Sequence, residues 1–88
     1  MCTMISNTTS VTGAGKSAEG WFAITHACVG YDHATHSANE HALLLDFINR
    51  DLGPGARVAV ELDLPSGRAL LSELQAAIAA AEAAGFEE

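Results

Sequence analysis

Basic residues are scarce in this chain of 88 residues. Eleven acidic residues stand against four basic ones, which gives a formal net charge of −7 with neutral histidines. The basic residues are scattered along the sequence as Lys16, Arg50, Arg57 and Arg68. A protein that binds nucleic acid or an anionic membrane surface needs clustered positive charge opposite the phosphates. We therefore expect neither nucleic acid nor a membrane among the partners.

Long apolar runs and cysteines are also few. No segment approaches the roughly 18–20 consecutive apolar residues that a membrane-spanning helix needs. The first ten residues, MCTMISNTTS, lack the basic region and apolar run of a secretory signal. No hydrophobic stretch of a lipoprotein signal precedes Cys2. The sequence therefore predicts a cytoplasmic protein in which Cys2 and Cys28 are thiols rather than a disulfide.

The chain does contain enough apolar residues for one small core. They make up 49% of the sequence, which is too many for a disordered protein. The length suits a single domain over residues 1–88. Because a core of this size stabilises weakly, such domains often gain stability from a metal ion or a second subunit. We expect a homo-oligomer, most simply a dimer.

Four segments typical of β-strands precede one helical segment. Residues 57–64, RVAVELDL, alternate most clearly, with Val58, Val60, Leu62 and Leu64 inward and Glu61 among the outward residues. The order predicts an α+β fold, with a mainly antiparallel four-stranded sheet followed by one C-terminal α-helix. The predicted elements are strands over residues 2–12, 21–32, 41–49 and 57–64, a turn over residues 13–20 and a helix from about Pro65 to Gly85.

Packing follows from where the apolar side chains fall. The strand over residues 21–32 is partly apolar on both faces, which predicts a central strand covered on one side by the helix and on the other by a second subunit. The helix carries an apolar stripe that we expect to pack on the sheet, with a subunit contact as the alternative. The stripe consists of Leu70, Leu74, Ala77, Ile78 and Ala81.

The stretch YDHATHSANEH, residues 31–41, holds three of the four histidines. Antiparallel hairpins would bring Cys2 beside this stretch and return the chain at His41. We therefore predict that His33, His36, His41 and Cys2 gather at one end of the sheet as ligands of a divalent transition metal. Imidazole and thiolate favour zinc, with iron or copper as further candidates.

Two carboxylates flank the histidines. Asp32 and Glu40 are candidate catalytic residues, as a general base or as groups that orient a ligating histidine. As strand neighbours, Glu40 and His41 should point apart. We hypothesise a small metal-binding protein whose ion acts on a small molecule. The alternatives are a metal-free module that binds a small ligand or associates with itself, and a solvated turn, since Asp, Asn, Ser and His are common in turns.

The remaining motifs give weaker evidence for a functional site. His26 and Cys28 share one strand face, where a core or interface histidine and a buried thiol are expected more often than a catalytic pair. Asp46, on an otherwise apolar strand, needs solvent or a partner such as Arg50 or Arg57. A phosphate-binding loop at Gly15-Lys16 is excluded, because Ser10 occupies the position of the required glycine.

Several segments together resemble a short bacterial family that has no assigned function. They are the MCT start and the runs GWFAITHACVGYDH, EHALLLDFIN and GPGARVAVELD before an alanine-rich helix. The resemblance spans nearly the whole chain and implies one compact domain. It implies no catalytic residue.

Overall fold

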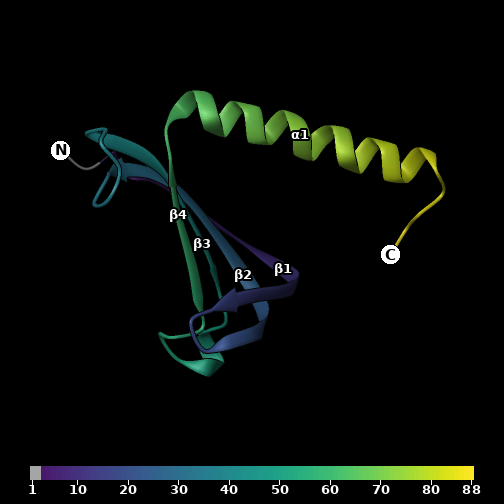
Figure 1. Cartoon of the computed structure of the whole chain (residues 1–88), viewed down its shortest axis with the longest axis horizontal. Coiled ribbons are helices and arrows are strands. Elements are labelled where there is room, and N and C mark those ends of the chain that lie inside the picture. Colours follow the sequence, from purple (N-terminus) through teal and green to yellow (C-terminus); the bar gives the residue numbers. More distant parts are fainter. Residues whose placement is uncertain (1–2) are drawn as a thin grey trace.

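The computed structural model describes residues 3–88 and shows a twisted antiparallel sheet followed by one long helix (Figure 1). The strands neighbour one another in sequence order. The predicted α+β fold is therefore confirmed. The elements are β1 (Ile5–Ser17), β2 (Gly20–His33), β3 (His41–Ile48), the short 3-10 helix η1 (Arg50–Leu52), β4 (Arg57–Leu62) and α1 (Leu64–Ala83).

The hairpin between β1 and β2 is tighter than the sequence predicts. We expected a turn over residues 13–20, because glycine and small polar residues are typical of turns. Instead β1 continues to Ser17, and only residues 18–19 form the turn. Between Ser10 and Gly13, β1 advances one residue more than β2. Such a bulge lets a strand bend without leaving the sheet, so these glycines belong to a bent strand and the turn prediction was wrong.

The strand register gives β2–β4 two different faces. Val29 pairs with Leu45, which pairs in turn with Val60. Paired residues point to the same side of a sheet, and successive residues point to opposite sides. The apolar face carries Val29, Tyr31, His33, His41, Leu43, Leu45, Phe47, Val58, Val60 and Leu62. The other face, here called the charged face, carries His26, Cys28, Asp32, Ala42, Leu44, Asp46, Ile48, Arg57, Ala59 and Glu61.

The connection between β3 and β4 is organised by Asn49, which is only 8% exposed. Its Nδ2 donates to the carbonyl of Ala23 at 2.9 Å, and its Oδ1 accepts from the amide of Asp51 at 3.1 Å. Its own amide donates to the carbonyl of Ala56 at 3.2 Å. Because both ends of the buried side-chain amide have partners, Asn49 ties this connection to β2.

The helix α1 begins and ends close to the predicted residues. The carboxylate of Asp63 caps it by accepting from the amide of Ser66 at 2.8 Å, and Pro65 lies in its first turn. Hydrogen bonding from Ser66, first from its side chain and then from its amide, lowers the pKa of Asp63 below its ordinary value. After the helix, Gly85 has a φ of 88°, which glycine adopts readily. Within the described residues, no helix combines the length and apolar character needed to cross a membrane.

Beyond its first turn, α1 leaves the sheet. Gly67 lies so close to Leu43 that a Cβ on the glycine would overlap Leu43 Cδ1. Past this contact the helix projects away from the strands (Figure 1), and all its residues except Gly67 are exposed. The prediction that the apolar stripe packs on the sheet of its own chain was wrong. The close contact at the first turn fixes the start of the helix, and the rest extends away from the sheet (Figure 1).

The core of one chain is consequently small. Among residues 3–88, the buried apolar residues are Ala27, Ala42 and Ala56, and no large side chain is fully buried. On β2, Trp21 is 71% exposed and Val29 is 42% exposed. The helix therefore does not supply the cover that we expected for the central strand.

Candidate metal site

His33 and His41 face each other at the end of the β2–β3 hairpin. The two residues are directly paired in the strand register, so both side chains lie on the apolar face. Their ring centroids are 4.7 Å apart, and the ring planes differ by 28°. The ring of His41 also stacks against that of Tyr31, with centroids 5.8 Å apart. The sheet thus holds two of the predicted ligands side by side.

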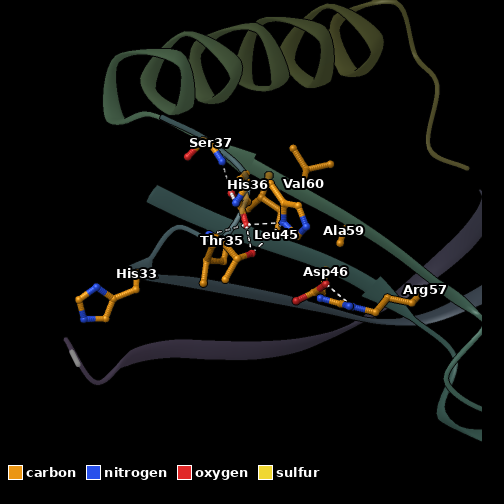
Figure 2. Close-up of a pocket in the computed structure, with 11 residues that line it drawn as sticks. His33, Thr35, His36, Ser37, Leu45, Asp46, Arg57, Ala59 and Val60 are labelled. Atoms are coloured by element: carbon orange, nitrogen blue, oxygen red, sulfur yellow. Dashed lines mark hydrogen bonds and ion pairs between the residues drawn. The ribbon is translucent and has the colours of Figure 1, made fainter. Parts of the chain in front are cut away.

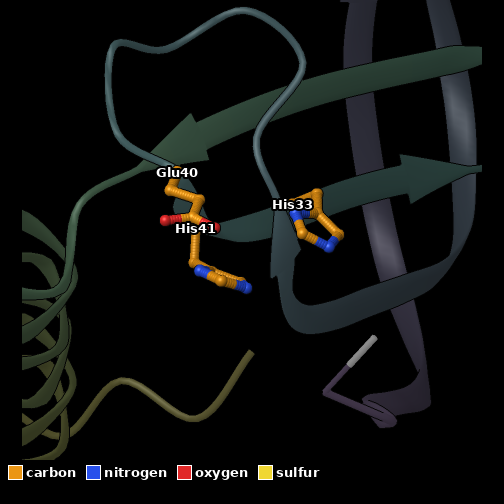
Figure 3. A group of neighbouring side chains, drawn as sticks. All are labelled: His33, Glu40 and His41. Atoms are coloured by element: carbon orange, nitrogen blue, oxygen red, sulfur yellow. The ribbon is translucent and has the colours of Figure 1, made fainter. Parts of the chain in front are cut away.

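Glu40 completes a group of three side chains. One potential ligand atom from each of His33, Glu40 and His41 lies within 4.8 Å of the others, and Figure 3 shows the three together. Glu40 belongs to the loop before β3 rather than to the strand, so strand alternation does not separate it from His41. The expectation that these two side chains point apart was therefore wrong. His33 and Glu40 are exposed, and His41 is half-buried.

This group suits a divalent transition metal in ligand type and in reach. Nitrogen and oxygen ligands lie about 2.0–2.2 Å from zinc, so tetrahedral ligand atoms are about 3.3 Å apart. The ligand atoms here are within 4.8 Å, and side-chain rotation in exposed residues can close the difference. Two imidazoles and one carboxylate also form a known ligand set for zinc and for iron(II) when further coordination positions stay open.

His36 lies apart from the group, beside the charged face. Its Nδ1 is 3.4 Å from Oε2 of Glu61, a residue of β4 that pairs with Leu44. The His36 side chain is 88% exposed. Figure 2 shows the His33 ring pointing away from His36. The structure therefore brings together His33 and His41, but not His36.

Glu61 anchors the loop between β2 and β3. Its carboxylate accepts hydrogen bonds from the Thr35 hydroxyl at 2.7 Å and from the amides of Thr35, His36 and Ser37 at 3.1, 2.9 and 2.8 Å. The bond from the Thr35 hydroxyl, followed by those from the amides, lowers the pKa of Glu61 far below its ordinary value. Because the same loop ends at Glu40, this anchor helps to fix where the chain re-enters the site.

Sequence reasoning missed this role of Glu61. Alternation along β4 correctly placed the residue on the opposite side from Val60, where a solvated carboxylate is the ordinary interpretation. The available signal was weak. Thr35 and Ser37 flank His36 and offer hydrogen-bond donors, but the sequence does not say which carboxylate receives them.

Two other candidate residues lie outside the group or outside the described residues. Asp32 lies on the charged face, and its Oδ1 accepts from the amide of His33 at 2.8 Å. Its carboxylate therefore braces the backbone of a candidate ligand. Cys2 falls outside the described residues, so its role as a ligand stays a prediction. The nearby start of β1 does lie beside the end of β2, where Ile5 pairs with Tyr31.

His26 and Cys28 contact other side chains. The Nδ1 of His26 lies 2.9 Å from the Thr25 hydroxyl, and the Cys28 thiol accepts from the Thr8 hydroxyl at 3.6 Å. Both are half-buried on β2. These contacts agree with a structural role, which the sequence favoured for both residues.

A pocket of about 690 Å³ opens on the charged face beside the loop (Figure 2). Within it, Asp46 Oδ1 accepts from Arg57 Nε at 2.6 Å. This is one of the two arginine partners that the sequence suggested for Asp46, and the bond raises the pKa of Arg57. Because Thr35, His36 and Ser37 of the loop donate hydrogen bonds to Glu61, both carboxylates of the pocket, Asp46 and Glu61, already have partners. Of the three candidate metal ligands, His33 lines this pocket, whereas Glu40 and His41 do not.

Comparison with known proteins shows the family of this chain. The model of a family of unknown function, DUF6295, matches residues 1–87. The chain belongs to this family. The match confirms the resemblance to a family without an assigned function. No curated protein and no solved structure matches the chain. Because DUF6295 is a family of unknown function, membership assigns no activity to the chain.

Proposed function

We propose that this protein binds a divalent transition metal ion through His33, Glu40 and His41. The observation that carries the proposal is the approach of their potential ligand atoms to within 4.8 Å at one end of the sheet. Two of the three residues are placed by direct strand pairing, so much of the site is organised before an ion arrives. Zinc is favoured, and iron or copper would accept the same ligands.

Three protein ligands leave coordination positions open. We extend the proposal to a small molecule or a water molecule at such a position, because the exposed side chains of His33 and Glu40 leave the site open to solvent. An ion of this kind polarises a bound carbonyl or lowers the pKa of a bound water. In this role Glu40 acts as a ligand, and Asp32 as the residue that braces His33.

Metal titration of protein purified without a histidine tag tests the proposal. We expect one zinc or cobalt ion per chain by calorimetry and by elemental analysis. Loss of a direct ligand should weaken binding by more than the roughly 10- to 100-fold that loss of an outer-shell partner costs. We therefore expect His41→Ala and His33→Ala each to lower the affinity by at least about 100-fold.

The chain offers a matched control in His36, which lies in the same loop but beside the charged face. His36→Ala should leave the affinity within about twofold of the unmutated protein. Glu40→Gln should weaken binding, whereas Glu19→Gln in the distant β1–β2 turn should not. Substoichiometric metal in the unmutated protein, or equal losses in the His36 and His41 variants, would refute the proposed site and favour the metal-free alternative.

A further inference from the structure

A single chain exposes more surface than a folded protein of its size. The accessible surface is 6529 Å², whereas a folded monomer of 9.1 kDa exposes about 4,900 Å². The excess is about 1,600 Å². The radius of gyration is 14.6 Å, whereas a compact chain of this length has about 12 Å. The chain is therefore more open than a compact monomer, as expected for one subunit of a larger assembly.

The excess surface includes two apolar surfaces, here called walls, that border the angle between α1 and the sheet (Figure 1). One wall is the apolar face of the sheet, where the β3 and β4 side chains are only half-buried. The other is the side of α1 that carries Gly67, the residue in contact with Leu43. Helical periodicity places Leu71, Leu74 and Ile78 on that side of the helix, and they are 56%, 51% and 57% exposed.

We propose that a second copy of the chain fills this angle, so that α1 of each chain packs on the apolar face of the other. A two-fold axis makes such an exchange reciprocal, because each chain supplies one helix and one sheet face. Covering an excess of about 1,600 Å² on each of two chains would bury about 3,200 Å², which lies in the range of obligate homodimers. The contact would bury large side chains, none of which is fully buried among residues 3–88 of one chain.

The geometry favours a second copy over closure of α1 on its own sheet. Asp63 caps the helix directly after β4 ends at Leu62, so no linker separates the two elements. The contact between Gly67 and Leu43 then fixes the first turn. Without a hinge, the later turns have no simple route to their own apolar face.

Charge also favours a second copy over a charged partner. All four charged side chains of β2–β4 lie on the opposite face from Leu45 and Val60. Leu71, Leu74 and Ile78, on the side of the helix that carries Gly67, are uncharged as well. Two uncharged walls from the same chain match each other, whereas neither presents a pattern that would select an acidic or basic protein.

Sedimentation equilibrium in the presence of a chelator tests the dimer independently of any metal. We expect twice the chain mass of 9.1 kDa at micromolar concentration. Leu74→Glu should abolish the dimer. Ala76→Glu adds the same charge on the opposite side of the helix and should keep it. A monomeric unmutated protein would overturn the proposal and would leave the two walls to close on each other or to bind another protein. Equal loss of the dimer in both variants would also overturn it.

Because Leu74→Glu could unfold the chain, a second measurement uses the unmutated protein. Mixed dimers of isotope-labelled and unlabelled chains should show inter-chain nuclear Overhauser effects between the methyl groups of Ile78 or Leu74 and those of Leu45 or Val60. A dimer without these inter-chain contacts would contradict the exchanged helix.

Discussion

His33 and His41 pair directly across β2 and β3, with ring centroids 4.7 Å apart, although the loop of residues 34–40 separates them in the sequence. The sheet register thus places two imidazoles, while the loop places Glu40 beside them. The loop is in turn held from the other face by Glu61. A site built in this way should respond to changes in the loop anchor as well as in the ligands.

Tyr31 should matter for metal affinity through its stack on His41. We expect Tyr31→Ala to weaken zinc binding by roughly 2- to 10-fold, because an aromatic pair contributes about 0.5–1.5 kcal/mol to holding a ring in place. Tyr31→Phe keeps the ring and should bind like the unmutated protein. Calorimetric titration of the three proteins measures the effect. Equal affinities for the Ala and Phe variants would show that the stack does not orient His41.

Glu61→Gln should loosen the loop without removing a candidate ligand. The carboxylate accepts from the amides of Thr35, His36 and Ser37, and a neutral carboxamide is a weaker and less complete acceptor. We expect these three amides to exchange with deuterium several-fold faster in the variant. The amide of Ala34 donates to a backbone carbonyl and serves as an internal control. Unchanged exchange at all three amides would contradict the anchor.

The lowered pKa of Glu61 gives the same anchor a pH dependence. A carboxyl whose pKa is lower in the folded than in the unfolded protein stabilises the fold above its ordinary value of 4.5. That contribution is lost progressively as the pH falls below 4.5 toward the folded pKa. Unfolding measured from pH 7 to pH 3 should therefore show a smaller loss of stability for Glu61→Gln than for the unmutated protein. A larger loss in the variant would reverse the predicted sign.

Asn49→Ala should lower the free energy of unfolding. The substitution leaves the carbonyl of Ala23 and the amide of Asp51 without their side-chain partner at a buried position. Such a loss costs about 1–3 kcal/mol. Asn39→Ala, in the exposed part of the loop, is the matched control and should change stability by less than about 0.5 kcal/mol. Denaturant unfolding of both variants at one protein concentration decides the comparison.

Gly30 is the position in β2 where the neighbouring strand leaves no room for a side chain. A Cβ there would lie 2.8 Å from the backbone carbonyl oxygen of Ile5, which can move only if β1 moves. We expect Gly30→Ala to destabilise the protein by about 1–3 kcal/mol. Gly13→Ala meets no atom within 4 Å and should be nearly neutral in the same unfolding assay. If Gly30→Ala leaves the free energy of unfolding unchanged, β1 can shift more easily than its pairing with β2 suggests.

The fold could be predicted because its signals are local. Alternation identified β4, although the strand predicted over residues 57–64 ran past the observed end at Leu62, and Pro65 and Gly85 marked the helix ends. The turn over residues 13–20 was wrong because a glycine-rich segment can also form a bulged, bent strand. Cover of the sheet by α1 was wrong because helical periodicity identifies an apolar side but not what packs on it.

The site could be predicted only in part. Spacing and hairpin logic brought His33 and His41 together, since direct pairing across a hairpin follows from the register. The same logic could not place His36 or Glu40, because both lie in the loop and follow its conformation rather than strand alternation. That conformation depends on Glu61, whose partners are distant in the sequence.

Anomalous diffraction at the zinc absorption edge, from crystals grown with zinc, tests the central claim most directly. We predict one strong peak per chain about 2.0–2.2 Å from a ring nitrogen of His33, a ring nitrogen of His41 and a carboxylate oxygen of Glu40. The same peak should disappear in crystals of His41→Ala and persist in those of His36→Ala. A peak at His36 and Glu61 instead, or no ordered zinc near His33 and His41, would contradict the proposed metal site.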